Sequence, residues 1–295
     1  MQQTTFEDIF KAAAVDGFVH ARDLGSGGEI GYRADTAVVA ASVFKVPVLV
    51  ELFRQSDAGL VDLTEPVTVP VAGRAPGPTG LSVMLGPVTL SWRDLALSMM
   101  VVSDNAATDV ICAKVGLSKV NATMRALGLP GTAVDFDCRG LFAQMGQDAG
   151  VANLADFPTH PDAELVRRLR VLDAPKTNRT TPREISSLFE MIWADRAASP
   201  DSCAQMRRIL GAQVWPHRLA SGFPEDHIKT AGKTGTLVIV RNEAGMVSYG
   251  NGRNIAVSVF TRSHEVRIKH PAQDAAIGKA AHLAVDMLAA QDTAG

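Results

Sequence analysis

The sequence predicts an α/β protein of the α+β type, in which a five-stranded antiparallel sheet is flanked by helices and interrupted by an inserted all-helical domain. Two observations lead to this prediction. Strand-like apolar runs lie only near the two ends of the 295-residue chain, and apolar residues at helical spacing fill its middle. Strands from the two ends then pair in one sheet. We expect a discontinuous sheet domain over 1–40 and 200–295, a helical domain over 41–199, and a cleft between them.

The expected sheet begins with a hairpin, because two strand-like runs flank the turn cluster Gly-Ser-Gly-Gly at 25–28. A short helix over 6–15 precedes this hairpin, and an amphipathic helix over 271–290 closes the chain. The five expected strands are 18–21, 29–32, 236–240, 245–249 and 254–260.

The middle of the chain carries several helix signals. Apolar residues from 42 to about 55 predict a buried helix, and Ser91-Trp92-Arg93-Asp94 resembles a capping box that starts another. Thr181-Pro182-Arg183-Glu184 combines an N-cap, a proline and an acid, which predicts a helix to 198. The other expected helices are 106–115, 118–127 and 163–172. The segment 66–87 and most of 131–178 are expected to form loops.

Composition excludes several function classes. The formal net charge of −2, without a block of Lys or Arg, argues against nucleic-acid and anionic-membrane partners. Three distant cysteines suggest neither a disulfide framework nor a metal knuckle, and the seven histidines lack metal-ligand spacing, so no metal or cofactor is expected. The N-terminal residues lack a basic run followed by an apolar run, and no window reaches roughly 18 apolar residues, which predicts a cytoplasmic protein as given, a trimmed leader being the alternative.

Ser42-Val43-Phe44-Lys45 lies at the start of the expected buried helix. The i, i+3 spacing puts both functional side chains on one face, about 5–6 Å apart at Cβ. A serine becomes a nucleophile when a base removes its proton, and Lys45 serves as that base if burial and a nearby cation such as Lys233 lower its pKa. The backbone N–H of Ser42 can then face the oxyanion of an acyl-transfer intermediate.

Ser103-Asp104-Asn105 follows an apolar helical segment and begins the next one. One interpretation of the motif is structural: it caps the end of one helix and the start of the next. The other interpretation is catalytic: Ser103 relays a proton to the leaving group, Asn105 binds a substrate amide, and Asp104 holds the loop. Both readings can hold together.

Lys233-Thr234-Gly235-Thr236 precedes an expected strand, so a substrate could lie along the strand edge and pair with its backbone. A phosphate-binding P-loop is excluded. His227 occupies the position of its first glycine, and a strand rather than a helix is expected to follow.

The order of these three signals resembles the class A β-lactamase and penicillin-binding-protein family, with its S-x-x-K, S-D-N and K-T-G motifs. The runs 29–35 and 178–182, and Arg218 with Phe223-Pro224, are similar to flanking segments of that family. The resemblance implies that Ser42 is the acylated nucleophile, Lys45 its activator and Ser103 the relay. It also implies substrate contacts at Asn105, Lys233 and Thr234, and oxyanion-hole amides at Ser42 and Thr236. Arg218 is expected either to clamp a substrate carboxylate or to pair with an acid between the domains.

The chain departs from this family in one segment. Class A enzymes carry an Ω-loop with the pattern R-x-E-x-x-L-N, whose glutamate activates the deacylating water, whereas 139–145 here reads Arg-Gly-Leu-Phe-Ala-Gln-Met. Four acids of this segment are expected to be ordinary solvated or capping residues, the alternative being that a rebuilt loop brings one of them to the ester: Asp148, Asp156, Asp162 and Glu164. Cys138 is expected to be an ordinary thiol rather than a reactive one.

The sequence therefore predicts a serine hydrolase that cleaves an amide, lactam or ester bond of a small molecule through a Ser42 acyl-enzyme. One alternative is a β-lactamase in the strict sense or a D-Ala-D-Ala peptidase. An alternative of another class is a covalent β-lactam sensor with little turnover. A third, an inactive interaction module, is disfavoured because Ser42, Lys45, Ser103 and Lys233 are all intact.

Overall fold

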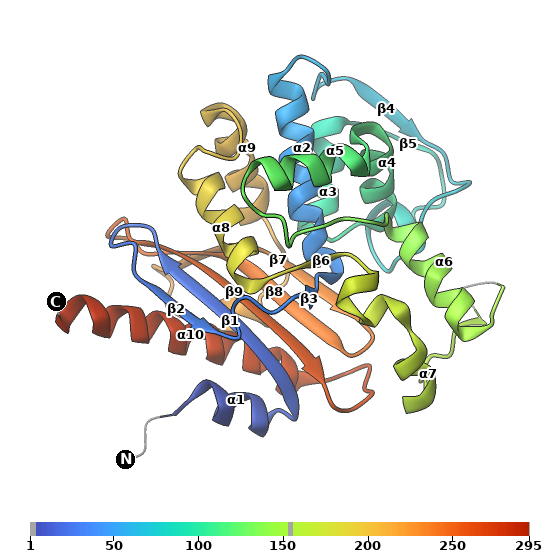
Figure 1. Ribbon diagram of the computed structural model, residues 1–295. Helices are drawn as coiled ribbons and strands as arrows, with labels where there is room; N and C mark the ends of the chain where they lie inside the picture. The colour runs from blue at the N-terminus through green and yellow to red at the C-terminus, as the bar shows by residue number, and fades with distance from the viewer. Residues whose placement is uncertain (1–3, 153–155, 295) are drawn as a thin grey trace.

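A computed structural model describes residues 4–152 and 156–294, and its central element is a five-stranded antiparallel sheet in the order β2-β1-β9-β8-β7 (Figure 1). Strands from the two ends of the chain meet where β1 pairs with β9, so the predicted sheet is confirmed. The strands are β1 (Val15–Asp23), β2 (Glu29–Tyr32), β7 (Lys229–Leu237), β8 (Val240–Ser248) and β9 (Asn254–Ser263).

Helices cover both faces of this sheet. Helices α1 (Phe6–Ala12) and α10 (Pro271–Ala294) lie on one face, and α8 (Pro182–Trp193) and the helical part of the molecule lie on the other (Figure 1). Because side chains alternate along a strand, β9 serves two cores. Val257 and Val259 pack with α1 and α10, whereas Phe260 packs with the helical part.

The helical part surrounds α2 (Lys45–Asp57), whose first nine residues are all buried. A short 3₁₀ helix, Ala41–Phe44, leads into α2, whereas the sequence predicted α-helix from residue 42. The remaining helices are α3 (Trp92–Val101), α4 (Asn105–Val115), α5 (Leu117–Ala126), α6 (Cys138–Ala149), α7 (Ala163–Arg168) and α9 (Pro200–Gly211). No helix in the described ranges combines the length and apolar composition that a bilayer span requires. The prediction about a leader rests partly on residues 1–3, which lie outside the described residues.

Two predicted helix starts are confirmed by their caps. The Ser91 hydroxyl accepts from the backbone N–H of Asp94, and the Thr181 hydroxyl accepts from that of Glu184. The end of α8 was predicted wrongly, at 198 instead of Trp193. The helix stops because Asp195 has a φ of +55°, which lies outside the α region.

Three segments differ from their predictions. The segment 66–87 was expected to be loop, but β4 (Pro66–Val69) pairs with β5 (Val88–Ser91). Helix α6 lies where most of the chain was expected to be loop, and α7 ends at Arg168 before a 3₁₀ turn, whereas helix was expected to 172. Short strands and a helix without clear apolar periodicity are set by tertiary partners more than by local pattern.

The strand expected over 236–240 was also wrong. β7 ends at Leu237, and Val238 and Ile239 form the turn to β8. The Lys-Thr-Gly motif therefore lies inside a strand and not before one, because pairing with β8 outweighs the weak strand propensity of its residues.

Candidate active site

Ser42 lies in the 3₁₀ helix before α2 and lines a cavity of about 400 Å³. Six residues predicted for the site line this cavity: Ser42, Ser103, Asn105, Arg218, Thr234 and Thr236. The other two, Lys45 and Lys233, are fully buried behind its wall. The structure thus brings together residues from three distant parts of the sequence.

Lys45 connects two of the motifs. Its Nζ donates to the carbonyl oxygen of Ser103 at 2.7 Å, to Ser103 Oγ at 3.3 Å and to Asn105 Oδ1 at 2.9 Å. In the described part of the chain, no hydrogen bond joins Lys45 to Ser42. Proton exchange between Lys45 and Ser103 therefore has a direct path, whereas proton exchange with Ser42 requires a side-chain movement.

Burial lowers the pKa of Lys45 below its ordinary value of 10.5, while acidic neighbours such as Asp104 and Asp109 act in the opposite direction. A lysine with a lowered pKa holds a larger neutral fraction near pH 7. Lys45 therefore has the electrostatic environment that a general base requires.

The Ser103 loop is held in a strained conformation. Ser103 has a φ of +61°, which costs energy for a residue other than glycine. Asp104 supports the loop, because its Oδ2 accepts from Ser98 Oγ and from the backbone N–H of Leu81, both at 2.7 Å. Its Oδ1 accepts from the N–H of Ala107 at 3.1 Å and caps α4.

Strand β7 runs directly against the segment that carries Ser42. A Cβ on Gly235 would lie 2.9 Å from the carbonyl oxygen of Ala40 and 3.2 Å from the backbone nitrogen of Ser42. β7 is an edge strand, and the N–H of Thr234 points away from the sheet to Gln213 Oε1. Thr236 has the same strand parity, so its N–H also leaves the free edge. Ser42 and Thr236 both line the cavity.

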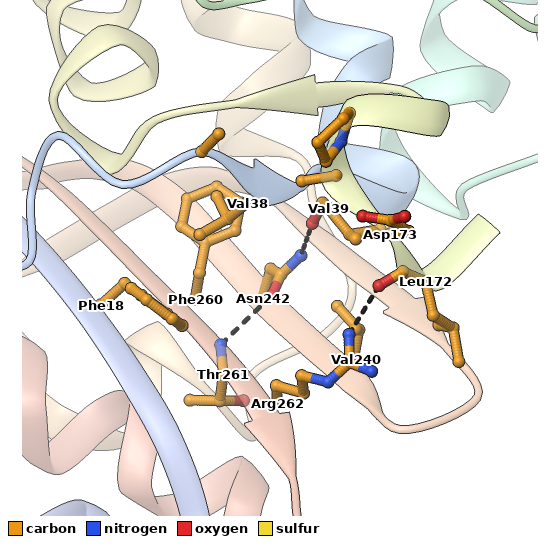
Figure 2. Close-up of a pocket in the computed structure, with 13 residues that line it drawn as sticks. Phe18, Val38, Val39, Leu172, Asp173, Val240, Asn242, Phe260, Thr261 and Arg262 are labelled. Carbon is orange, nitrogen blue, oxygen red and sulfur yellow. Dashed lines mark hydrogen bonds between the residues drawn. The ribbon is translucent and has the colours of Figure 1, made fainter. Parts of the chain in front are cut away.

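Asn242 ties the Ser42 segment to the sheet from the other side. It pairs with Gly235 across the ladder, and its Nδ2 donates to the carbonyl oxygen of Val39 at 2.9 Å and to that of Ala40 at 3.3 Å. Its Oδ1 accepts from the N–H of Thr261. Figure 2 shows this amide between Val39 and Thr261, in a separate cavity of about 260 Å³.

Arg218 pairs with an acid, but this acid lies in the same expected sheet domain and not across the domains, and the clamp for a substrate carboxylate stays a prediction. Arg218 Nε donates to Asp274 Oδ1 of α10 at 2.8 Å. Its other nitrogens donate to Thr236 Oγ1 at 2.7 Å and to the carbonyl oxygen of Gly235 at 2.8 Å, and it lines the cavity. The guanidinium therefore holds β7 and faces the site.

Lys233 does not face the cavity. Its Nζ donates to the carbonyl oxygen of Thr234 at 2.8 Å, and burial, followed by the charge of Lys45, lowers its pKa well below the ordinary value. Glu243 of β8 was missed by the sequence analysis. It is buried, accepts from Gln213 Nε2 and from the N–H of Leu219, both at 2.7 Å, and opposes the lowering of the Lys233 pKa. The sequence offered no local signal for it, because Glu243 lay between two expected strands and follows the polar residues Arg241 and Asn242.

Helix α6 occupies the place of the expected Ω-loop. Cys138 Sγ lies 3.5 Å from Asn105 Oδ1, and burial raises the pKa of this thiol to about 12, which keeps it protonated. Asp109 accepts from the N–H groups of Cys138 and Arg139, at 2.7 and 3.0 Å. Burial raises the pKa of Asp109 to about 6. The sequence analysis did not assign Asp109, although it lies four residues after Asn105 and therefore on the same face of α4.

The four acids of this segment do not reach the cavity. Asp148 accepts from the backbone N–H and Nε of Arg170, and Asp162 caps α7. Asp156 and Glu164 are exposed. Among the described residues, no Asp or Glu lines the Ser42 cavity, but three aromatic residues do: Phe142, Trp215 and His217. The sequence analysis did not assign these three, although the last two lie beside Arg218.

Comparisons with known proteins show the family and the fold of this chain. A family model described as the beta-lactamase enzyme family matches residues 2–288. The chain is 30% identical over 298 residues to the beta-lactamase regulatory protein BlaB of Streptomyces cacaoi, with 95% of each chain covered.

Solved structures share the fold at lower identity. A beta-lactamase from Sphaerobacter thermophilus DSM 20745 superposes with a TM-score of 0.79 at 24% identity, covering 98% of this chain and 99% of that one. PBP-A superposes with a TM-score of 0.75 at 22% identity, covering 96% of each chain. A beta-lactamase from Chitinophaga pinensis DSM 2588 gives a TM-score of 0.78 at 20% identity, covering 96% and 97%.

Proposed function

The chain belongs to the beta-lactamase enzyme family, and from this premise we propose that it is a serine hydrolase that forms an acyl-enzyme at Ser42. The observation that carries the proposal is the meeting of three motifs at one cavity. Ser42 lines that cavity, and the buried Lys45 donates hydrogen bonds to Ser103 and Asn105 behind it. Strand β7 packs closely against the Ser42 segment because Gly235 has no side chain.

In the proposed reaction, neutral Lys45 takes the proton of Ser42 Oγ as the oxygen attacks the substrate carbonyl carbon. The oxyanion that forms accepts hydrogen bonds from the N–H groups of Ser42 and Thr236. Lys45 passes the proton to Ser103 over the 3.3 Å contact between Nζ and Oγ, and Ser103 protonates the leaving nitrogen or oxygen. Water then hydrolyses the ester and restores the Ser42 hydroxyl.

The proposed substrates are small amides, lactams or esters. Asn105, Thr234 and Arg218 give the cavity polar and cationic lining, and buried Lys233 lies behind it. This arrangement suits a carboxylate or amide on the substrate, because charge-assisted hydrogen bonds are strong in a partly desolvated site. PBP-A also supports acylation, since a variant of that protein is described as an acyl-enzyme complex with penicillin G.

A second candidate is a covalent sensor that retains its acyl group. Two observations favour it: no carboxylate among the described residues lines the Ser42 cavity to activate water, and the relative from Streptomyces cacaoi is named as a regulatory protein. The two candidates share acylation of Ser42 and differ only in the rate at which the ester is hydrolysed.

Time-resolved mass spectrometry of the intact protein tests both candidates. Wild type, Ser42→Ala and the control Ser26→Ala, which alters an exposed turn, are mixed with a panel of β-lactams and activated esters. We expect an adduct in wild type and Ser26→Ala and none in Ser42→Ala. An adduct that decays with product release supports the hydrolase, and one that persists supports the sensor. Acyl transfer that survives Ser42→Ala would contradict both.

A further inference from the structure

The connection between β4 and β5, residues 70–87, contains Arg74 and runs beside α4 (Figure 1). All five N–H donors of the Arg74 guanidinium bind backbone carbonyl oxygens, either within this connection or at the end of β4. The distances are 2.8 or 2.9 Å, and the acceptors belong to Val69, Pro70, Leu81, Met84 and Gly86. Arg74 therefore ties the start of the connection to its end.

A guanidinium is suited to this role because its donors lie in one plane at fixed angles. The acceptors lie at positions 69–70 and between 81 and 86, so one side chain fixes the shape of the residues between them. A lysine has three donors and no fixed plane, so it could not bind all five carbonyl oxygens. The geometry thus depends on an arginine and not only on a positive charge.

The connection held by Arg74 is joined to the segment 102–106, which includes the Ser103-Asp104-Asn105 motif. Its hydrogen bonds run from Asn105 Nδ2 to the carbonyl oxygen of Pro76 (2.9 Å), from Thr79 Oγ1 to that of Val102 (2.7 Å), from the N–H of Leu81 to Asp104 Oδ2 (2.7 Å) and from the N–H of Ala106 to Ser82 Oγ (3.3 Å). Pro78 and Thr79 also line the Ser42 cavity. The connection thus forms one wall of the candidate site.

Two glycines show how closely the connection fits this motif. A Cβ on Gly77 would lie 3.0 Å from Asn105 Nδ2, and a Cβ on Gly80 would overlap the carboxylate of Asp104. Gly80 also has a φ of +61°, a conformation that favours glycine. Because no free space separates the two segments at these points, a change in the shape of the connection would displace the motif.

Asn105 links the connection to the proposed base. Its amide has one donating end and one accepting end. The Nδ2 end donates to the carbonyl oxygen of Pro76, so the Oδ1 end faces Lys45 Nζ and accepts from it at 2.9 Å. If the Pro76 carbonyl moved, the Asn105 amide would lose the contact that fixes its orientation, and Lys45 would lose a fixed acceptor.

We propose that Arg74 is a positioning residue for the acylation of Ser42: it holds the β4–β5 connection in the shape that orients Asn105 and, through Asn105, Lys45. Arg74 is not among the residues that line the Ser42 cavity, so it acts through its neighbours. This inference rests on the proposed acylation of Ser42 and adds to it a residue outside the three motifs.

The acylation rates of Arg74→Ala and Arg74→Lys test the proposal, measured by the mass of the Ser42 adduct with an activated ester. We expect both variants to react about 10- to 100-fold more slowly than wild type, because a misplacement of about 1 Å can cost about 100-fold even when its origin is remote from the reacting atoms. A wild-type rate in Arg74→Lys would overturn the proposal, since charge would then be sufficient. Arg74→Lys also keeps the test valid if Arg74→Ala does not fold.

Arg54→Ala is the matched control for a lost bond between an arginine and a backbone carbonyl. Arg54 Nη1 donates to the carbonyl oxygen of Ala197 at 2.8 Å, in the last turn of α2 and away from the cavity. Its acylation rate should equal that of wild type. A rate in Arg74→Ala equal to that in Arg54→Ala would overturn the proposal.

Added ethylguanidinium gives a readout that a general loss of stability would not move. In Arg74→Ala this ion can replace the deleted planar group among the five carbonyl oxygens. We expect millimolar ethylguanidinium to raise the acylation rate of Arg74→Ala several-fold and to leave that of Arg54→Ala unchanged. Ethylammonium, which has the same charge but a different shape, should have no effect. Equal acceleration by the two cations would contradict the role of the guanidinium geometry.

A double-mutant cycle tests the route through Asn105. If Arg74 acts through this amide, Arg74→Ala lowers the acylation rate much less in an Asn105→Ala background than in wild type. Equal fold-losses in the two backgrounds would overturn the proposed route. If no ester or β-lactam acylates Ser42 in wild type, the proposed function fails. If wild type and Arg74→Ala are acylated equally fast, only this inference fails.

Discussion

At the scale of single residues, Gly235 is required by space and not by backbone freedom. A Cβ there would press on the carbonyl oxygen of Ala40 and on the nitrogen of Ser42. The Ser42 segment would have to move away from β7, which would shift the N–H of Ser42 relative to that of Thr236. Gly235 thus sets the position of one proposed oxyanion donor.

We predict that Gly235→Ala lowers the acylation rate about 100-fold or more, the typical cost of losing one oxyanion-hole donor. The rate of Ser42 adduct formation measures this effect, and circular dichroism checks that the fold persists. Gly250→Ala is the matched control, because the nearest atom to its added Cβ lies 4.0 Å away. Equal acylation rates in the two variants would contradict the proposed donor pair.

Lys45 gives a second prediction at this scale. Its neutral form is the proposed base, and burial lowers its pKa from 10.5. Below the folded pKa the ammonium dominates, so the acylation rate should rise with pH and reach a plateau at a pH below 10.5. Single-turnover acylation from about pH 5 to about pH 10 measures this profile. A rate that still rises in proportion to hydroxide through this range would show that Lys45 is not the base.

At the scale of elements, the docking of α8 on the sheet depends on a buried histidine. His20 of β1 is 1% exposed, and its Nδ1 lies 2.5 Å from Ser186 Oγ. Arg183 Nη1 lies 2.9 Å from the other ring nitrogen, so that nitrogen accepts and the ring is neutral. Glu29 Oε2 lies 3.4 Å from His20 Nε2, so serine, histidine and glutamate occur together as in a catalytic triad. Ser186, however, is fully buried and its hydroxyl donates to backbone carbonyl oxygens, so this group has a structural role.

This contact predicts a loss of stability in acid. Burial, followed by the charge of Arg183, lowers the pKa of His20 below 6.5. As the pH falls through 6.5, His20 binds a proton in the unfolded chain but stays neutral in the folded chain. The free energy of unfolding therefore decreases as the pH falls below 6.5.

We predict that His20→Gln weakens the decline in Tm between about pH 7 and about pH 5, although its Tm at neutral pH is lower than that of wild type. His264→Gln, at a position 55% exposed, serves as the control and should keep the wild-type decline. Thermal unfolding at several pH values measures both. Identical acid sensitivity in His20→Gln and wild type would show that another group causes the decline.

At the scale of the whole molecule, the candidate site exists only where the sheet meets the helical part. Asn242 and Gly235 lie opposite each other in β8 and β7 and together hold the chain that leads to Ser42. Loss of the Asn242 amide leaves the carbonyl oxygen of Val39 and the N–H of Thr261 without these partners.

We therefore predict that Asn242→Ala lowers the free energy of unfolding by about 1–3 kcal/mol, because buried backbone groups of Val39 and Thr261 each lose a hydrogen-bond partner. It should also slow the acylation of Ser42 in the fraction that remains folded. Denaturant unfolding and adduct formation measure the two effects. Asn251→Ala, in an exposed turn, should change stability by less than about 0.5 kcal/mol. A similar small change in Asn242→Ala would rule out this link between sheet and nucleophile.

The sequence by itself determined the elements with a local cause. The N-caps at Ser91 and Thr181 and the buried periodicity of α2 depend on neighbours within one or two turns, so they were predicted correctly. The three motifs and the missing glutamate are also properties of the sequence alone. Their order was sufficient to indicate the family before any geometry was known.

Only the tertiary structure decided how these parts meet. Lys45 bonds residues 58 and 60 positions away, and β7 acquires its length from its partner β8. Helix α6, Gln213 and Glu243 had no decisive local signal. Their positions depend on packing between distant segments, and hydrophobic burial selects those contacts by area rather than by separation along the chain.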